Sequence, residues 1–135
     1  MKRSIVIAII LLMVSPLVIL SAKPNAAKVK LIYFHATTRC ESCLKIEKFT
    51  EMAVNELYAN ELKSGKLEYS SLDFMEEKNE KLAKKYSIDS QNLILSVIAK
   101  GKEKKWINLE AIWDKIASYE EFKSYIKDNI SKYLK

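Results

Sequence analysis

The chain has 135 residues, the length of one ordinary domain. Hydrophobic residues make up 49% and charged residues 30%, with only two glycines and two prolines, and this composition excludes a disordered, collagen-like or low-complexity protein. Two cysteines are too few for a miniprotein held by disulfides, so an apolar core has to stabilise the fold. The formal net charge of +6 comes from bases interleaved with acids, and we expect no nucleic-acid partner.

The N-terminal segment has the pattern of an export signal. Lys2 and Arg3 precede an apolar run over 5–20, and the small residues Ser21 and Ala22 follow it. A short basic start, an apolar stretch and a small-residue exit are typical of a secretory signal peptide. An uncleaved membrane anchor is the main alternative, because this uncharged stretch approaches the roughly 20 residues that span a bilayer. A buried core helix is a third interpretation.

This segment divides the chain into three parts. Residues 1–22 are predicted to be a signal peptide or N-terminal anchor, 23–27 a short linker, and 28–135 one folded domain. As a signal or an anchor, 1–22 would place the domain in a periplasmic or other extracytoplasmic space. If the segment stays uncleaved, it would also attach the protein to a membrane.

Hydrophobic patterns predict alternating strands and helices along the domain. Strands are expected at 28–34, 66–73, 93–99 and 103–109, and helices at 40–62, 75–86, 112–116 and 119–134. Thr37 and Thr38 offer hydroxyls that could cap the first helix, and Ser64-Gly65 ends it. The turn Lys100-Gly101-Lys102 makes the last two strands a hairpin.

The order of these elements favours an α/β fold. A strand, a crossover helix and a second strand form a parallel pair with a right-handed connection, and the hairpin adds antiparallel strands. Helices then fall on both faces of the sheet. We expect a single domain with a mixed four-stranded sheet, helices on both faces, and an apolar N-terminal helix in front of it.

Cys40 and Cys43 form a Cys-x-x-Cys motif where the first strand meets the first helix, and this motif has four interpretations. As a structural disulfide, the pair would close so short a loop that it would add only about 2 kcal/mol to the stability of the fold. As a zinc site it lacks ligands, because His35 is the one histidine of the chain and a fourth ligand would have to be a carboxylate or water. A chance pair of small buried residues is the third. The position at a helix start favours the fourth, a redox-active pair.

The spacing of the motif places the two thiols in different surroundings. Within the first helical turn, the sulfur of Cys40 can face solvent while that of Cys43 points toward the sheet. The helix N-terminus stabilises a thiolate by about 0.3–1 kcal/mol, which is less than one unit of pKa. Arg39 should lower the pKa of the Cys40 thiol further, and Glu41 should raise it. We therefore expect a moderately activated Cys40.

The chain resembles a thioredoxin-fold domain over about residues 28–134. The segments that carry the resemblance are Tyr33-Phe34, Cys40-Glu41-Ser42-Cys43, Leu72-Asp73-Phe74-Met75-Glu76, Leu82-Ala83-Lys84-Lys85-Tyr86-Ser87-Ile88 and the strand 93–99. More narrowly, Phe34-His35, Arg39-Cys40 and Cys43-Leu44-Lys45-Ile46-Glu47 are similar to small exported bacterial proteins labelled as a nitrophenyl-compound nitroreductase subunit family. The resemblance implies a thioredoxin-like fold with redox chemistry at the two cysteines.

The chain departs from thioredoxin at four places. Arg39 replaces the Trp before the motif, and Glu41-Ser42 replaces the Gly-Pro inside it. Phe34 stands six residues before Cys40, where that family carries a buried acid, and Gln91-Asn92 occupies the stretch of its cis-proline. These departures affect proton transfer to the buried thiol and the substrate-binding edge. They also leave room for a metal to approach the cysteines.

These features together predict an exported thiol–disulfide oxidoreductase. Cys40 would attack a substrate disulfide and Cys43 would resolve the mixed disulfide, with His35, Arg39 and Glu41 in support. We expect no separate cofactor beyond the redox-active Cys40–Cys43 disulfide, and a protein thiol or disulfide in the cell envelope as the partner of a monomer. One alternative is a copper-binding or copper-delivery module that uses Cys40, Cys43 and His35. The other is a non-catalytic accessory subunit of a partner reductase.

Overall fold

The computed structural model describes residues 27–134, which hold a four-stranded sheet and the helices that cover it. The elements in chain order are β1 (Lys28–His35), α1 (Glu41–Ser64), β2 (Leu67–Asp73), the 3-10 turn η1 (Glu77–Asn79), α2 (Glu80–Lys85), β3 (Asn92–Ala99), β4 (Lys102–Asn108), α3 (Ile112–Lys115) and α4 (Tyr119–Ile130). The predicted signal or anchor, with its apolar helix, lies outside the described residues.

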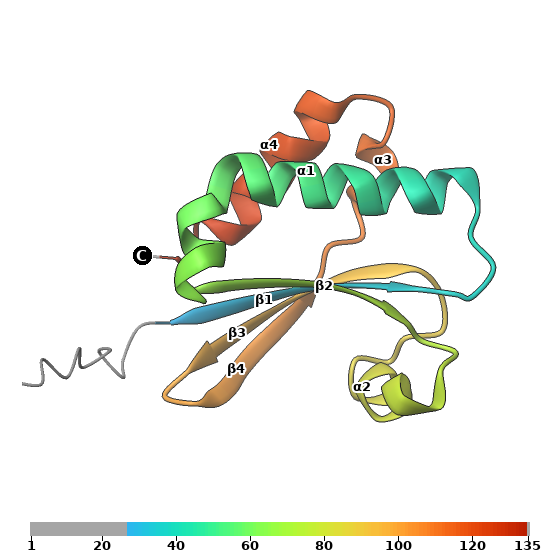
Figure 1. Ribbon diagram of the computed structural model, residues 1–135, viewed down its shortest axis with the longest axis horizontal. Helices are drawn as coiled ribbons and strands as arrows, with labels where there is room; N and C mark the ends of the chain where they lie inside the picture. Colours follow the sequence, from blue (N-terminus) through green and yellow to red (C-terminus); the bar gives the residue numbers. More distant parts are fainter. Residues whose placement is uncertain (1–26, 135) are drawn as a thin grey trace, which may run out of the picture.

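The sheet has the strand order β2-β1-β3-β4. β1 runs parallel to β2 and antiparallel to β3, and β3 and β4 form the antiparallel hairpin. A parallel neighbour needs a crossover, and α1 supplies it between β1 and β2 (Figure 1). β1 is therefore a central strand, and its run from Leu31 to Phe34 is wholly buried because both faces of the sheet are covered there.

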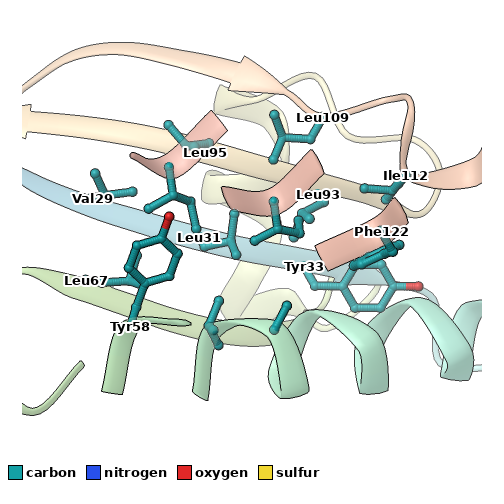
Figure 2. Packing of buried hydrophobic residues seen from close by; sticks show 14 of the residues in the cluster. Val29, Leu31, Tyr33, Tyr58, Leu67, Leu93, Leu95, Leu109, Ile112 and Phe122 are labelled. Carbon is teal, nitrogen blue, oxygen red and sulfur yellow. The ribbon is translucent and has the colours of Figure 1, made fainter. Parts of the chain in front are cut away.

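Helices cover both faces of the sheet, as the element order predicts. α1, α3 and α4 lie over one face, and α2 lies against the other (Figure 1). Leu31 and Tyr33 of β1 point into the larger apolar cluster between the sheet, α1 and α4, whereas Ile32 and Phe34 point into a smaller cluster under α2. Figure 2 shows the larger cluster, with Leu31 and Tyr33 between the sheet and α1. This alternation fixes which residues of β1 can reach the start of α1.

The first helix is long but interrupted. Tyr58 leaves the helical region with φ −134° and ψ 29°, and its hydroxyl donates to the Lys127 carbonyl of α4 at 3.2 Å. α1 ends at Ser64 on Gly65, which takes the left-handed conformation (φ 74°) and donates its N–H to the Leu62 carbonyl, so the predicted stop is confirmed. None of the helices within residues 27–134 is both long and apolar enough to cross a membrane.

Two predicted helices are shorter than expected. The helix expected over 75–86 is a 3-10 turn followed by the six-residue α2. Asn79 breaks the pattern because its side chain is turned inward and donates to the Asp73 carbonyl at 2.8 Å. The last helix ends at Ile130 instead of about 134, and Tyr133 and Leu134 pack against the larger cluster from the turn beyond it.

Candidate redox site

The connection between β1 and α1 carries the first cysteine. Thr37 and Thr38 do not cap α1, which corrects the sequence prediction. The Thr37 hydroxyl donates instead to the Asp73 carboxylate at the end of β2, at 2.6 Å. Cys40 is the N-cap residue, and its Sγ accepts a hydrogen bond from the Cys43 N–H at 3.0 Å. The sulfur of Cys40 therefore occupies the place where a helix start offers unpaired N–H groups to an anion.

Cys40 and Cys43 form a disulfide across the first turn of α1, with their Cα atoms 5.0 Å apart. Cys40 is exposed, whereas Cys43 is 1% exposed and faces the sheet. The predicted difference in exposure between the two cysteines is therefore present. An attacking or leaving thiol can reach the sulfur of Cys40, while the sulfur of Cys43 is reached through Cys40.

Tyr33 of β1 holds the buried Cys43 in place. Its hydroxyl donates to the Cys43 carbonyl at 3.0 Å, and Figure 2 shows its ring between β1 and α1. Burial raises the pKa of Tyr33 to about 12, against the lowering effect of Arg39. The hydroxyl therefore stays protonated at neutral pH and remains a hydrogen-bond donor to this carbonyl.

Arg39 is paired with an acid of α1. Its guanidinium forms an ion pair with the Glu47 carboxylate and lies 6.0 Å from the centroid of the Tyr33 ring. The two side chains are only 21% and 26% exposed. Burial alone would raise the pKa of Glu47, but hydrogen bonding and the charge of Arg39 outweigh it and hold that pKa below its ordinary value. Arg39, expected to act as a cation on Cys40, thus has its charge largely balanced.

The two other predicted supporting residues are Glu41 and His35. Glu41 is exposed in the first turn of α1. His35 ends β1, with its Nδ1 3.0 Å from the Ala36 carbonyl oxygen, and it lines an open hollow together with Ser71 and Asp73. Between residues 27 and 134, no three His, Cys, Asp or Glu side chains are grouped so that they could hold a metal ion. In this disulfide form, His35 and the two cysteines do not form such a group.

The position six residues before Cys40 does not face the cysteines. Phe34 packs under α2, with its ring 6.1 Å from that of Tyr86. Tyr33, one residue earlier, is on the face of α1. Tyr33 and Glu47 were both absent from the predicted site. Glu47 could have been found from its spacing, because it follows Cys43 by one helical turn and so shares its inward side.

Comparisons with known proteins find distant structural similarities. No protein-family model matches the sequence, and no curated protein matches it. Among solved structures, the chain is similar to a Fasciola hepatica thioredoxin (19% identity, 81% of this chain and 84% of that one, TM-score 0.48). It is also similar to thioredoxin O2 of Arabidopsis thaliana in the oxidised state (16% identity, 76% and 75%, TM-score 0.46). A structure described as a malarial protein is 20% identical over 76% of this chain and 98% of that one, with a TM-score of 0.46.

The topology itself identifies the fold. The parallel β1-α1-β2 crossover, the antiparallel β3–β4 hairpin and the closing helix α4 follow one another as the sequence predicts, and the sheet has the strand order β2-β1-β3-β4. The Cys-x-x-Cys pair stands at the start of α1, at the end of the central strand. The domain accordingly has a thioredoxin-like fold.

Proposed function

We propose that the protein is a thiol–disulfide oxidoreductase that works through Cys40 and Cys43. The observation that carries the proposal is the unequal placement of the two sulfurs: Cys40 is exposed at the helix N-cap, and Cys43 is buried one turn further on. A disulfide with a structural role needs no such difference. Thiol–disulfide exchange needs this difference, because one thiol has to be accessible to the substrate and the other has to stay close to it to resolve the mixed disulfide.

The reaction follows from this arrangement in two steps. In the reducing direction, the Cys40 thiolate attacks one sulfur of a substrate disulfide, forms a mixed disulfide and releases the first substrate thiolate. The Cys43 thiol then loses its proton and attacks the Cys40 sulfur, which releases the second substrate thiolate and closes the Cys40–Cys43 disulfide. Two electrons pass to the substrate, and the reverse sequence oxidises a dithiol.

The N-cap geometry supports the role of Cys40 as the nucleophile. The Cys43 N–H, which donates to Cys40 Sγ in the disulfide, is positioned to donate to a thiolate at the same place. The helix N-terminus stabilises the same negative charge. The role of Cys40 thus depends on backbone groups of α1 more than on a neighbouring side chain.

Two finer parts of the proposal rest on the sequence. The basic, apolar and small-residue pattern over 1–22 supports export to a periplasmic or other extracytoplasmic space, where the partner would be a protein thiol or disulfide of the cell envelope. The similarity of the segments around the motif to the nitroreductase-subunit group is the sole support for that narrower assignment. No nitro-compound substrate follows from it.

Trapping of mixed disulfides tests the proposal. Cys43→Ser should leave a nucleophile without a resolving thiol, so it should accumulate mixed disulfides with dithiol or disulfide substrates on non-reducing gels. Cys40→Ser should form none and should lose exchange activity. In the reduced protein, Cys40 should be alkylated faster than Cys43 near neutral pH, because the thiolate is the reactive form.

The same experiment separates the alternatives. Equal alkylation rates together with unchanged exchange activity in Cys40→Ser would contradict the mechanism and favour an accessory subunit. A tight stoichiometric Cu(I) complex of the reduced protein that is lost in Cys40→Ser would favour metal delivery. Ser42→Ala, a change inside the motif that leaves both sulfurs in place, is the matched control for the trapping assay.

A further inference from the structure

The ion pair of Arg39 and Glu47 joins the two ends of the cysteine motif. Arg39 directly precedes Cys40, and Glu47 lies one helical turn beyond Cys43. Both side chains are mostly buried, at 21% and 26% exposed. A pair placed in such surroundings is screened less by solvent than a surface pair, so its charges act more strongly on their neighbours.

The pair is connected to Cys43 through Tyr33. The Arg39 guanidinium lies 6.0 Å from the centroid of the Tyr33 ring, and the Tyr33 hydroxyl donates to the Cys43 carbonyl at 3.0 Å. Tyr69 of β2 closes the other side, with its hydroxyl 3.5 Å from the Glu47 carbonyl. The Nε of Arg39 is buried without a hydrogen-bond partner, whereas its Nη2 donates to the Glu47 carboxylate and thereby holds the guanidinium in place.

We propose that Glu47 is a positioning residue that holds Arg39 against Tyr33 and balances its charge, and that it thereby sets the dithiol–disulfide equilibrium of Cys40 and Cys43. The inference rests on the proposed function, because it assigns a regulator to that exchange reaction. The physical reason is the charge of the reduced form. The reduced state can place a thiolate on Cys40, whereas the disulfide state carries no charge there, so an unbalanced cation beside Cys40 stabilises only the reduced form. Glu47 cancels much of that effect.

The equilibrium with glutathione measures this directly. Two glutathione thiols reduce the Cys40–Cys43 disulfide to the dithiol and become glutathione disulfide, so the atoms and the two electrons balance. Glu47→Gln keeps the size and hydrogen-bonding capacity of the side chain but removes its charge, and it should shift the equilibrium toward the dithiol by about fivefold. Arg39→Gln should shift it toward the disulfide, because it removes the cation and leaves the Glu47 carboxylate unbalanced. The double variant should return close to the unmodified protein.

Glu51→Gln is the matched control. Glu51 lies one turn further along α1 and is exposed, so this change removes the same charge from the same helix without touching the pair. It should leave the glutathione equilibrium unchanged. Loss of stability alone would not reproduce the expected pattern, because a purely structural effect weakens both redox forms together and leaves their ratio as it was.

The outcomes separate this inference from the proposed function. If the unmodified protein exchanges with glutathione and Glu47→Gln behaves like Glu51→Gln, the role of Glu47 is wrong and the exchange function stands. If the double variant stays as far from the equilibrium of the unmodified protein as either single variant does, the two charges do not balance each other, and the inference also fails. If the unmodified Cys40–Cys43 disulfide does not exchange at all, the proposed function itself is overturned.

Discussion

Cys43 is held at both of its peptide groups. Its N–H donates to Cys40 Sγ, and its carbonyl accepts from the Tyr33 hydroxyl at 3.0 Å. Its side chain is 1% exposed. A resolving thiol has to meet the mixed disulfide in one geometry, and fixing its backbone in advance lowers the entropic cost of that encounter. The hydroxyl of Tyr33 is thus the contact through which the sheet positions this cysteine.

Tyr33→Phe tests that contact. The variant keeps the ring and loses the hydroxyl, so we expect the free energy of unfolding of the oxidised protein to fall by about 1 kcal/mol. Tyr58→Phe is the control, because it loses a hydroxyl that donates at a longer 3.2 Å to the Lys127 carbonyl. Urea unfolding of both variants measures the difference. A smaller loss for Tyr33→Phe than for Tyr58→Phe would show that the Cys43 contact contributes little.

The individual residues of the site were only partly predictable from the sequence. The exposure of Cys40 and the burial of Cys43 follow from helical spacing, which is local. The cap was predicted wrongly because Thr37 is drawn to Asp73, a residue that only the pairing of β1 with β2 brings near. The ion pair of Arg39 with Glu47 was likewise not predictable from local sequence. It depends on which side of α1 faces the sheet, and the residues next to Arg39 in the chain do not reveal it.

α2 is an element that other elements hold in place. It has six residues, and an isolated helix of that length does not persist in water. Its C-cap residue Tyr86 donates its hydroxyl to Glu103 of β4 at 2.6 Å, and Lys85 forms an ion pair with the same carboxylate at 2.9 Å. The fully buried Ser96 of β3 also donates to Glu103. One carboxylate thus ties α2 to the hairpin.

Glu103→Ala should therefore weaken the attachment of α2 to its face of the sheet. The change leaves the donors of Ser96 and Tyr86 without their acceptor in a partly buried place, and we expect a loss of about 2–3 kcal/mol in the free energy of unfolding. Glu80→Ala is the control on α2 itself, because Glu80 pairs with Lys84 on the exposed side of the helix and such pairs contribute a few tenths of a kcal/mol. Equal effects in urea unfolding would contradict the assigned role of Glu103.

At the scale of elements, the strands were easier to predict than the short helices. The strands expected at 28–34 and 93–99 agree with β1 and β3 within a residue, because buried apolar runs have few other structures open to them. The helix expected over 75–86 is split. In the sequence, Asn79 fits the expected helix, but in the structure its side chain donates to the Asp73 carbonyl at the end of β2. Periodicity carries no information about such a contact.

The whole domain should lose stability in acid. Five carboxylates have pKa values below their ordinary values of 4.5 for Glu and 3.8 for Asp: Glu47, Glu56, Glu68, Asp73 and Glu103. For Glu47 and Glu103 burial acts in the opposite direction and is outweighed, whereas hydrogen bonds from neighbouring side chains dominate at the other three. A lowered pKa in the folded state means that the stability is fully present above the ordinary value and is lost as the pH falls through the lowered one.

We therefore expect a constant melting temperature from about pH 7 to pH 5 and a progressive fall below about pH 4.5. Thermal unfolding of the oxidised protein across this range measures it. Glu103→Gln should flatten the acid limb, because that variant lacks one of the linked carboxylates. A melting temperature that rises on acidification below pH 4.5 would contradict the assignment of these groups.

The protein should be processed on export. The pattern over 1–22 predicts a mature N-terminus near Lys23 in a cell-envelope fraction. Mass spectrometry of the protein recovered from fractionated cells measures its N-terminus. Recovery of the envelope protein with 1–22 intact would favour the anchor, and an intact chain in the cytosol would contradict export.

The central place of β1 in the sheet has a consequence for how the protein opens. β1 is paired along its length with β2 on one side and β3 on the other, and the cysteine motif begins five residues after its end. Its amide protons should exchange with deuterium only when the entire domain unfolds, while those of the exposed Thr37 and Thr38 should exchange within local openings. Cys40 therefore lies beside the boundary between the slowest and the fastest exchanging amides. We expect that Cys40 can move while β1, whose Tyr33 contacts the Cys43 carbonyl, stays in place.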